Sequence, residues 1–71
     1  MSKYTEKMKE AAERPDLHRM EYGTVFEAAV RFSMSTGSVK KIAEEAGAVR
    51  HLGRLTRYNL RQIGEYIDGK E

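Results

Sequence analysis

The chain has 71 residues, with thirteen Lys and Arg against eleven Asp and Glu and a formal charge of +2. At this length a chain makes one small domain with a thin core, because folding buries only about 60% of the surface that the unfolded chain exposes. Cysteine is absent, which excludes disulfides, a cysteine nucleophile and cysteine-ligated zinc. The longest apolar run, residues 28–30, cannot span a membrane, and the first residues lack the apolar core of a secretory signal. We therefore expect a cytoplasmic module with no membrane segment.

The charge is unevenly distributed along the chain. Residues 35–61 contain six basic and two acidic side chains, whereas the segments on both sides are neutral or acidic. The six basic residues are Lys40, Lys41, Arg50, Arg54, Arg57 and Arg61. A local excess of this kind is the electrostatic footprint of a protein that binds a phosphate backbone, although a solvated basic face gives the same pattern.

Residues 1–16 are predicted to form a helix-like or flexible segment ahead of a domain that covers residues 17–71. The apolar side chains of the first segment recur at helical spacing as far as Pro15, which disfavours a helical conformation for the residue before it. Only one large apolar side chain falls on each turn, so this helix would be marginal alone, and a loose tail is the alternative. The loose alternation of residues 17–22 predicts a short strand that ends at Gly23.

Two short helices are predicted to follow. Thr24 and Glu27 have the spacing of a capping box, and apolar residues then recur at helical spacing over about eight residues. After a short break, Ser35 or Thr36 caps a second helix, which ends at Gly47. Two short helices with so tight a connection form a helix-turn-helix.

A hairpin and a last helix complete the predicted domain. Residues 49–52 and 55–58 predict two four-residue strands around a glycine turn. Asn59 is placed to cap a final helix over residues 60–67. The order of elements predicts an α+β winged helix-turn-helix, with three short core helices, an antiparallel hairpin as the wing, and an N-terminal helix or tail.

The second helix and the hairpin have the side chains that a DNA-binding surface needs. Amides at a helix N-terminus attract a phosphate, and hydroxyl and lysine side chains reach base edges or backbone oxygens. In the helix, the expected contacts are Thr36, Gly37, Ser38, Lys40 and Lys41. Further expected contacts are Arg50, Arg54 and Arg57, with His51 when it is protonated, and Arg61 in the last helix. An ordinary amphipathic surface helix is the alternative for this segment.

The stretch from Tyr22 to Ile67 resembles the small excisionases, which are recombination directionality factors of conjugative transposons and phages. The resemblance rests on Tyr22, Thr24 and Phe32 and on residues 26–29, 35–45, 53–54 and 60–68. It implies a winged helix related to the MerR-type DNA-binding domain. The recognition helix would then carry the predicted contacts of residues 36–41, and the wing would carry the three hairpin arginines.

The resemblance also implies a function and its partners. An excisionase binds repeats near the end of a mobile element, bends the DNA and directs the integrase of that element, a tyrosine recombinase, toward excision. Implied partners are double-stranded DNA, the integrase, and neighbouring copies of the same protein on the DNA. Cooperative binding is expected because a single module of this size buries only about 600–1,000 Å².

Other functions are less well supported by the residues. We expect no enzyme activity, cofactor or metal, because His18 and His51 are 33 positions apart and there is no glycine-rich phosphate loop. A small MerR-like transcription regulator is one alternative, although the chain lacks a long dimerising helix. A protein-interaction module that uses the N-terminal apolar stripe and the last helix is the other, and it would expose an apolar patch in place of a basic one.

Overall fold

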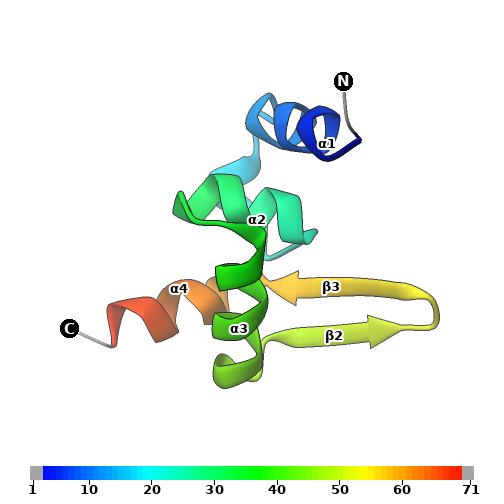
Figure 1. Cartoon of the computed structure of the whole chain (residues 1–71). Coiled ribbons are helices and arrows are strands. Elements are labelled where there is room, and N and C mark those ends of the chain that lie inside the picture. Colours follow the sequence, from blue (N-terminus) through cyan, green and yellow to red (C-terminus); the bar gives the residue numbers. More distant parts are fainter. Residues whose placement is uncertain (1–2, 70–71) are drawn as a thin grey trace.

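The computed structural model describes residues 3–69, which contain four α-helices and one three-stranded antiparallel sheet (Figure 1). The helices are α1 (Lys3–Ala12), α2 (Val25–Phe32), α3 (Thr36–Ala46) and α4 (Leu60–Asp68), and a 3-10 turn, η1 (Leu17–Arg19), lies between α1 and α2. The strands are β1 (Tyr22–Gly23), β2 (Val49–Leu52) and β3 (Leu55–Asn59), with β3 in the middle of the sheet. The result is a compact α+β domain.

Side-chain caps start α2 and α3 where the sequence predicts them. The Thr24 hydroxyl accepts a hydrogen bond from the Glu27 amide at 3.2 Å, and the Glu27 carboxylate accepts one from the Thr24 amide at 2.8 Å. Ser35 accepts a hydrogen bond from the Ser38 amide at 3.1 Å, so it, and not Thr36, caps α3. These bonds satisfy amides that have no acceptor inside their helix.

Asn59 joins the hairpin to α4. Its side chain accepts a hydrogen bond from the Gln62 amide at 2.9 Å, which confirms the predicted cap. Its own amide donates to the Ala48 carbonyl at 2.8 Å and so continues the pairing at the base of the hairpin. The strand β3 therefore includes Asn59 and is one residue longer than predicted.

The core lies where α2, α3, α4 and β3 meet. Val39, Leu60 and Ile63 are its largest fully buried side chains. Alanine side chains of α2 and α3 fill much of the remaining space, and their small size lets these elements pack closely. Phe32 is half-buried at the edge of the core, with the Arg31 guanidinium 5.4 Å from the centre of its ring.

The predicted strand over residues 17–22 is wrong except at its end. The first half forms η1, and only β1 pairs with β3. Leu17 is buried, and the Arg31 side chain donates to the Met20 carbonyl at 2.7 Å and to the Leu17 carbonyl at 3.4 Å. A side chain from α2 thus satisfies carbonyls that a longer strand would direct into the sheet, and the segment turns instead of extending.

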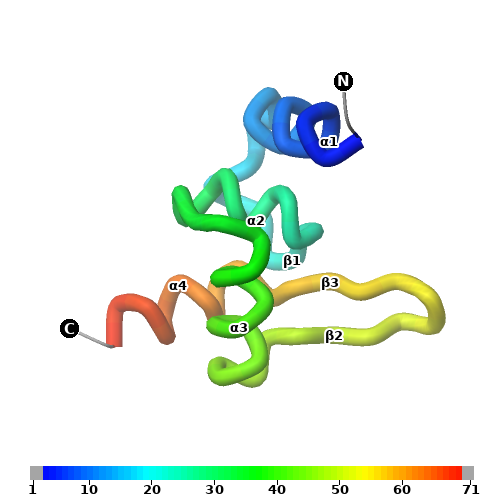
Figure 2. The backbone as a smooth tube through the Cα atoms, in the orientation of Figure 1, coloured from blue at the N-terminus to red at the C-terminus, as the bar shows by residue number. Residues whose placement is uncertain are grey.

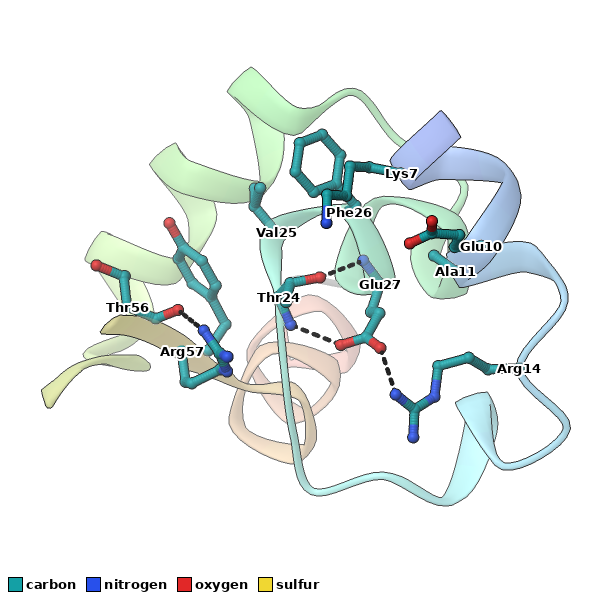
Figure 3. Close-up of a pocket in the computed structure, with 11 residues that line it drawn as sticks. Lys7, Glu10, Ala11, Arg14, Thr24, Val25, Phe26, Glu27, Thr56 and Arg57 are labelled. Carbon is teal, nitrogen blue, oxygen red and sulfur yellow. Dashed lines mark hydrogen bonds and ion pairs between the residues drawn. The ribbon is translucent and has the colours of Figure 1, made fainter. Parts of the chain in front are cut away.

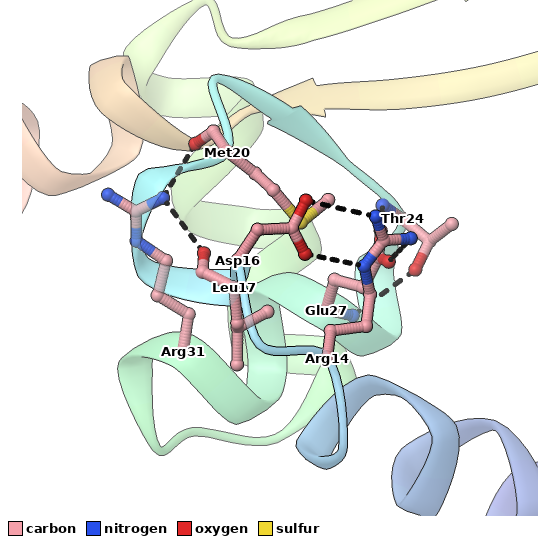
Figure 4. A network of polar contacts seen from close by, with 7 residues as sticks. All are labelled: Arg14, Asp16, Leu17, Met20, Thr24, Glu27 and Arg31. Carbon is pink, nitrogen blue, oxygen red and sulfur yellow. Dashed lines mark hydrogen bonds and ion pairs between the residues drawn. The ribbon is translucent and has the colours of Figure 1, made fainter.

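Residues 3–12 of the N-terminal segment form the helix α1, which packs on α2 and is not a loose tail. Ala11 is buried, and the Tyr4 and Phe26 rings meet edge to face with their centres 5.7 Å apart. The Arg14 guanidinium donates to the Glu27 carboxylate at 3.0 Å (Figure 4). Apolar contact and a charged hydrogen bond therefore both hold α1 against the domain.

Candidate nucleic-acid interface

The solvent face of α3 carries the residues that the sequence predicts to contact DNA. Val39 and Ala43 are completely buried, which fixes one face of this helix against the core. The predicted contact residues lie on the N-terminal part of the solvent face, and Glu44 and Glu45 are exposed nearer its C-terminal end. Gly37, Ser38, Lys40 and Lys41 are exposed, and Thr36 is half-buried. We call the five predicted contact residues, Thr36, Gly37, Ser38, Lys40 and Lys41, the α3 surface.

The first turn of α3 is open to an approaching group. The Ser35 hydroxyl accepts a hydrogen bond from the Ser38 amide and donates one to the Ser38 hydroxyl at 3.0 Å. The amides of residues 36 and 37 have no acceptor within the helix, as in the first turn of any helix. A Cβ added to Gly37 would meet no atom closer than the Ser35 hydroxyl, at 4.0 Å. Open backbone donors at a helix N-terminus suit a phosphate oxygen.

Lys40 and Lys41 add two positive charges within one turn of these amides. Neither forms an ion pair with another residue of the described chain, although Glu44 and Glu45 follow four residues later. Burial raises the pKa of the Tyr58 hydroxyl, and the nearby charge of Glu44 adds to that rise. Because neither lysine is in an ion pair within the described residues, both lysine charges are available to an external anion.

The hairpin of β2 and β3 extends away from the helices and ends in its turn (Figures 1 and 2). Its register pairs Arg50 with Arg57, His51 with Thr56, and Leu52 with Leu55. Gly53 has a φ of +63°, a conformation that favours glycine and closes the tight turn. Arg54 is exposed in this turn. We call residues 52–55 the hairpin tip.

The other two hairpin arginines are partly engaged within the fold. Arg50 donates to the Gly47 carbonyl and to the Gln62 side chain, each at 2.8 Å, and so joins the end of α3 to the first turn of α4. Arg57 donates to the carbonyl of the preceding residue at 2.9 Å. Both side chains are half-buried, whereas Arg54 is exposed, so the tip is the more accessible part of the predicted wing surface.

His51 and Arg61 complete the predicted contact residues. His51 is exposed, and its ring nitrogen lies 3.4 Å from the Thr56 hydroxyl across the hairpin. Arg61 is exposed in the first turn of α4 and forms no ion pair with another described residue. The accessible cations therefore belong to separate elements, and the turn between β2 and β3 lies well apart from α3 (Figure 2).

Two open hollows also mark the surface. The larger, about 520 Å³, lies between α1, the start of α2 and β3 (Figure 3). Its Glu27 carboxylate is engaged by the Thr24 amide and by Arg14, so these groups serve the fold. The smaller, about 390 Å³, is lined by Tyr22, Arg50, Leu52 and Arg57. Within residues 3–69, no three His, Asp or Glu side chains gather as a metal site requires.

Two residues at the hairpin tip were not among the predicted contacts. Leu52 and Leu55 are 64% and 52% exposed, more than any other large apolar side chain of the described chain. Their alternation with arginine is typical of any half-buried strand and conceals this exposure. Their position in the sequence could have indicated this exposure. Two residues that flank a two-residue hairpin turn lie on the same face of the hairpin and far from the core.

These features define a small α+β domain with two separate basic surfaces. The chain belongs to a family of unknown function, DUF6462, which matches residues 20–69. The match begins after α1 and η1 and includes both the α3 surface and the hairpin tip. Comparison with curated proteins and with solved structures found no match. No helix of residues 3–69 is long and apolar enough to cross a membrane.

Proposed function

We propose that this protein is a winged helix-turn-helix DNA-binding protein that acts as an excisionase. The α3 surface would enter the major groove, and the hairpin would be the wing that contacts the neighbouring backbone or minor groove. On the DNA, several copies would bind repeats near the end of a mobile element. The bent complex would direct a tyrosine recombinase toward excision in the cytoplasm.

The observation that carries the DNA-binding proposal is the exposure of unpaired cations on α3 and at the hairpin tip. The turn between α2 and α3 has three residues, 33–35, and Ser33 adopts a left-handed φ of 54° that reverses the chain there. This turn presents α3 beside α2, with its first turn and both lysines toward solvent. Exposed cations without an ion pair remain hydrated and therefore do not destabilise the folded state. When they bind phosphates, they release the counterions of the DNA.

The excisionase role rests on the resemblance of residues 22–67 to that class of protein and on the size of the domain. A domain with two contact surfaces and a thin core supplies no catalysis of its own in this role. Bending of a short DNA site costs on the order of 1–6 kcal/mol, which several copies bound side by side would share. The integrase would carry out the strand exchange.

The DNA-binding step is tested with duplexes selected by the protein from a random library, using fluorescence anisotropy at two salt concentrations. The double variant Lys40→Ala, Lys41→Ala should bind about a hundredfold more weakly, since each lost lysine contact is worth roughly 1.4 kcal/mol. Arg54→Ala should reduce the slope of log affinity against log salt by about one if this arginine contacts a phosphate.

The matched control is Lys7→Ala, Lys9→Ala, which removes the same charge from exposed positions of α1. This variant should bind as the wild type does. Equal loss in both double variants would indicate a general charge effect and would contradict the proposed α3 contact. The excisionase role is tested separately, by measuring excision of the element by its own tyrosine recombinase with and without this protein.

A further inference from the structure

The hairpin tip carries an aliphatic pair that the fold does not use. Leu52 and Leu55 are directly opposite each other in the register, so their side chains lie on one face of the hairpin and close together. Neither belongs to the core or to the partly buried side chains packed around it. Substitution of these leucines should therefore change the stability of the domain little. An exposed apolar pair of this kind indicates contact with a molecule outside the described chain.

The surroundings of the pair are cationic. Arg54 stands between the two leucines in the turn, and the cross-strand pair Arg50 and Arg57 comes next on the same face. The sequence contains no acidic residue between Glu45 and Glu65. An aliphatic tip beside arginine side chains, on a hairpin without acidic residues, is complementary to a stacked base step between two phosphate strands, and it is poorly suited to a basic protein surface.

The shape of the tip fits the same occupant. The turn is only two residues long, and the hairpin carries it away from the helices (Figure 1). Only side chains of the tip need to enter a groove, while the strands remain outside it. Proteins that kink DNA insert leucine and similar apolar side chains between base pairs from the minor groove, and basic side chains beside them hold the phosphates.

The geometry points to Leu52 and Leu55 as a wedge that inserts between base pairs and bends the bound DNA, with Arg54 beside it in the groove. This inference rests on the proposed function, because it assigns to the hairpin tip the bending that an excisionase requires. It also gives the two basic surfaces different roles. The α3 surface supplies affinity, and the hairpin tip supplies the bend.

The test uses duplexes selected by the wild-type protein, labelled at both ends for energy transfer and carrying 2-aminopurine at successive steps of the site. The wild type should raise energy transfer and increase 2-aminopurine fluorescence at one step, which marks unstacking. The double variant Leu52→Asn, Leu55→Asn should lose both signals while it binds more tightly than Lys40→Ala, Lys41→Ala. The variant Leu52→Met, Leu55→Met keeps an apolar tip and should retain both signals.

Thermal unfolding of each variant verifies that the fold is intact, as the exposure of both leucines leads us to expect. Unchanged energy transfer and 2-aminopurine fluorescence in the asparagine variant would overturn the wedge while leaving the proposed DNA binding intact, and would assign the leucines to a protein contact. A wild-type protein that selects no duplex would overturn the proposed function itself, and the wedge with it.

Discussion

Two arginines near the start of the domain, Arg14 after α1 and Arg31 in α2, are used differently from the basic side chains of α3 and the hairpin tip. In the first region, Arg14 donates to Asp16 and Glu27, and Arg31 donates to the carbonyls of the segment that leads into β1 (Figure 4). In the second region, the lysines of α3 and Arg54 form no ion pair within residues 3–69. A count of charges cannot separate these roles, because it is the hydrogen-bond partner that decides whether a cation completes the fold or remains available to a ligand.

Arg50 marks the boundary between the two regions. It lies on the hairpin, yet its guanidinium joins the Gly47 carbonyl to the Gln62 side chain in the manner of Arg31. It also donates to the Val49 carbonyl at 3.2 Å, and a guanidinium with five donors can still offer one to a phosphate after three are engaged. We therefore expect Arg50 to contribute mainly to the packing of α4 against α3, and Arg54 to contribute mainly to binding.

The largest expected effect on stability comes from Arg31→Ala, which removes a cation that completes the fold. The variant loses hydrogen bonds from a charged donor to the carbonyls of Met20 and Leu17, and it should lower the free energy of unfolding by about 2 kcal/mol. Its affinity for DNA, corrected for the folded fraction, should not change. Urea denaturation followed by circular dichroism measures the first quantity, and anisotropy measures the second. Arg19→Ala, at an exposed position of η1, is the control and should be neutral.

A stable Arg31→Ala protein with weakened DNA binding would contradict the division between folding and binding cations. Arg31 would then act at the interface, and its contacts to the carbonyls would be incidental. The opposite result in Lys40→Ala, Lys41→Ala, namely a loss of stability, would contradict the same division from the other side.

Local signals explain which parts of the fold could be predicted from the sequence. The caps Thr24, Ser35 and Asn59 each stand three residues before the amide they bind, so residue type and spacing are sufficient. The hairpin turn depends only on Gly53 and the strands beside it. Consequently the starts of three helices and the position of the hairpin were predicted within one residue.

Distant contacts explain what could not be predicted. The η1 turn depends on Arg31, which binds carbonyls eleven and fourteen residues earlier in the chain. Arg50 resembles any other basic residue of the hairpin until Gln62, twelve residues later, is placed beside it. The exposure of Leu52 follows from the direction in which the whole hairpin projects. Patterns within a few residues contain none of this information.

A smaller effect, on both stability and DNA binding, is expected from a substitution in the first turn of α3. Gly37 has space for a Cβ and no left-handed φ, so Gly37→Ala should raise the free energy of unfolding by about 0.5 kcal/mol through helix propensity. If a phosphate approaches the open amides there, the added methyl group should weaken DNA binding. Stability and affinity would then change in opposite directions. An alanine variant that binds as well as the wild type would show that no ligand approaches this backbone.

The smallest effect concerns the charge pair on the folding side. The hydrogen bond from Arg14 lowers the pKa of Asp16, so the charged form of this carboxylate is favoured in the folded state. The contribution to stability is present above the pKa of an unfolded aspartate, about 3.9, and is lost as the pH falls through the lower pKa of the folded state. Asp16→Asn should therefore be less stable than the wild type at pH 7, and this difference should shrink as the pH falls below about 4. Thermal unfolding across this range measures it, with Glu6→Gln on the exposed face of α1 as the control. A stability difference between Asp16→Asn and the wild type that stays constant with pH would mean that Asp16 acts through its shape in the turn and not through its charge. The ion pair of Arg14 with Glu27 would then be the charged contact that holds α1 in place.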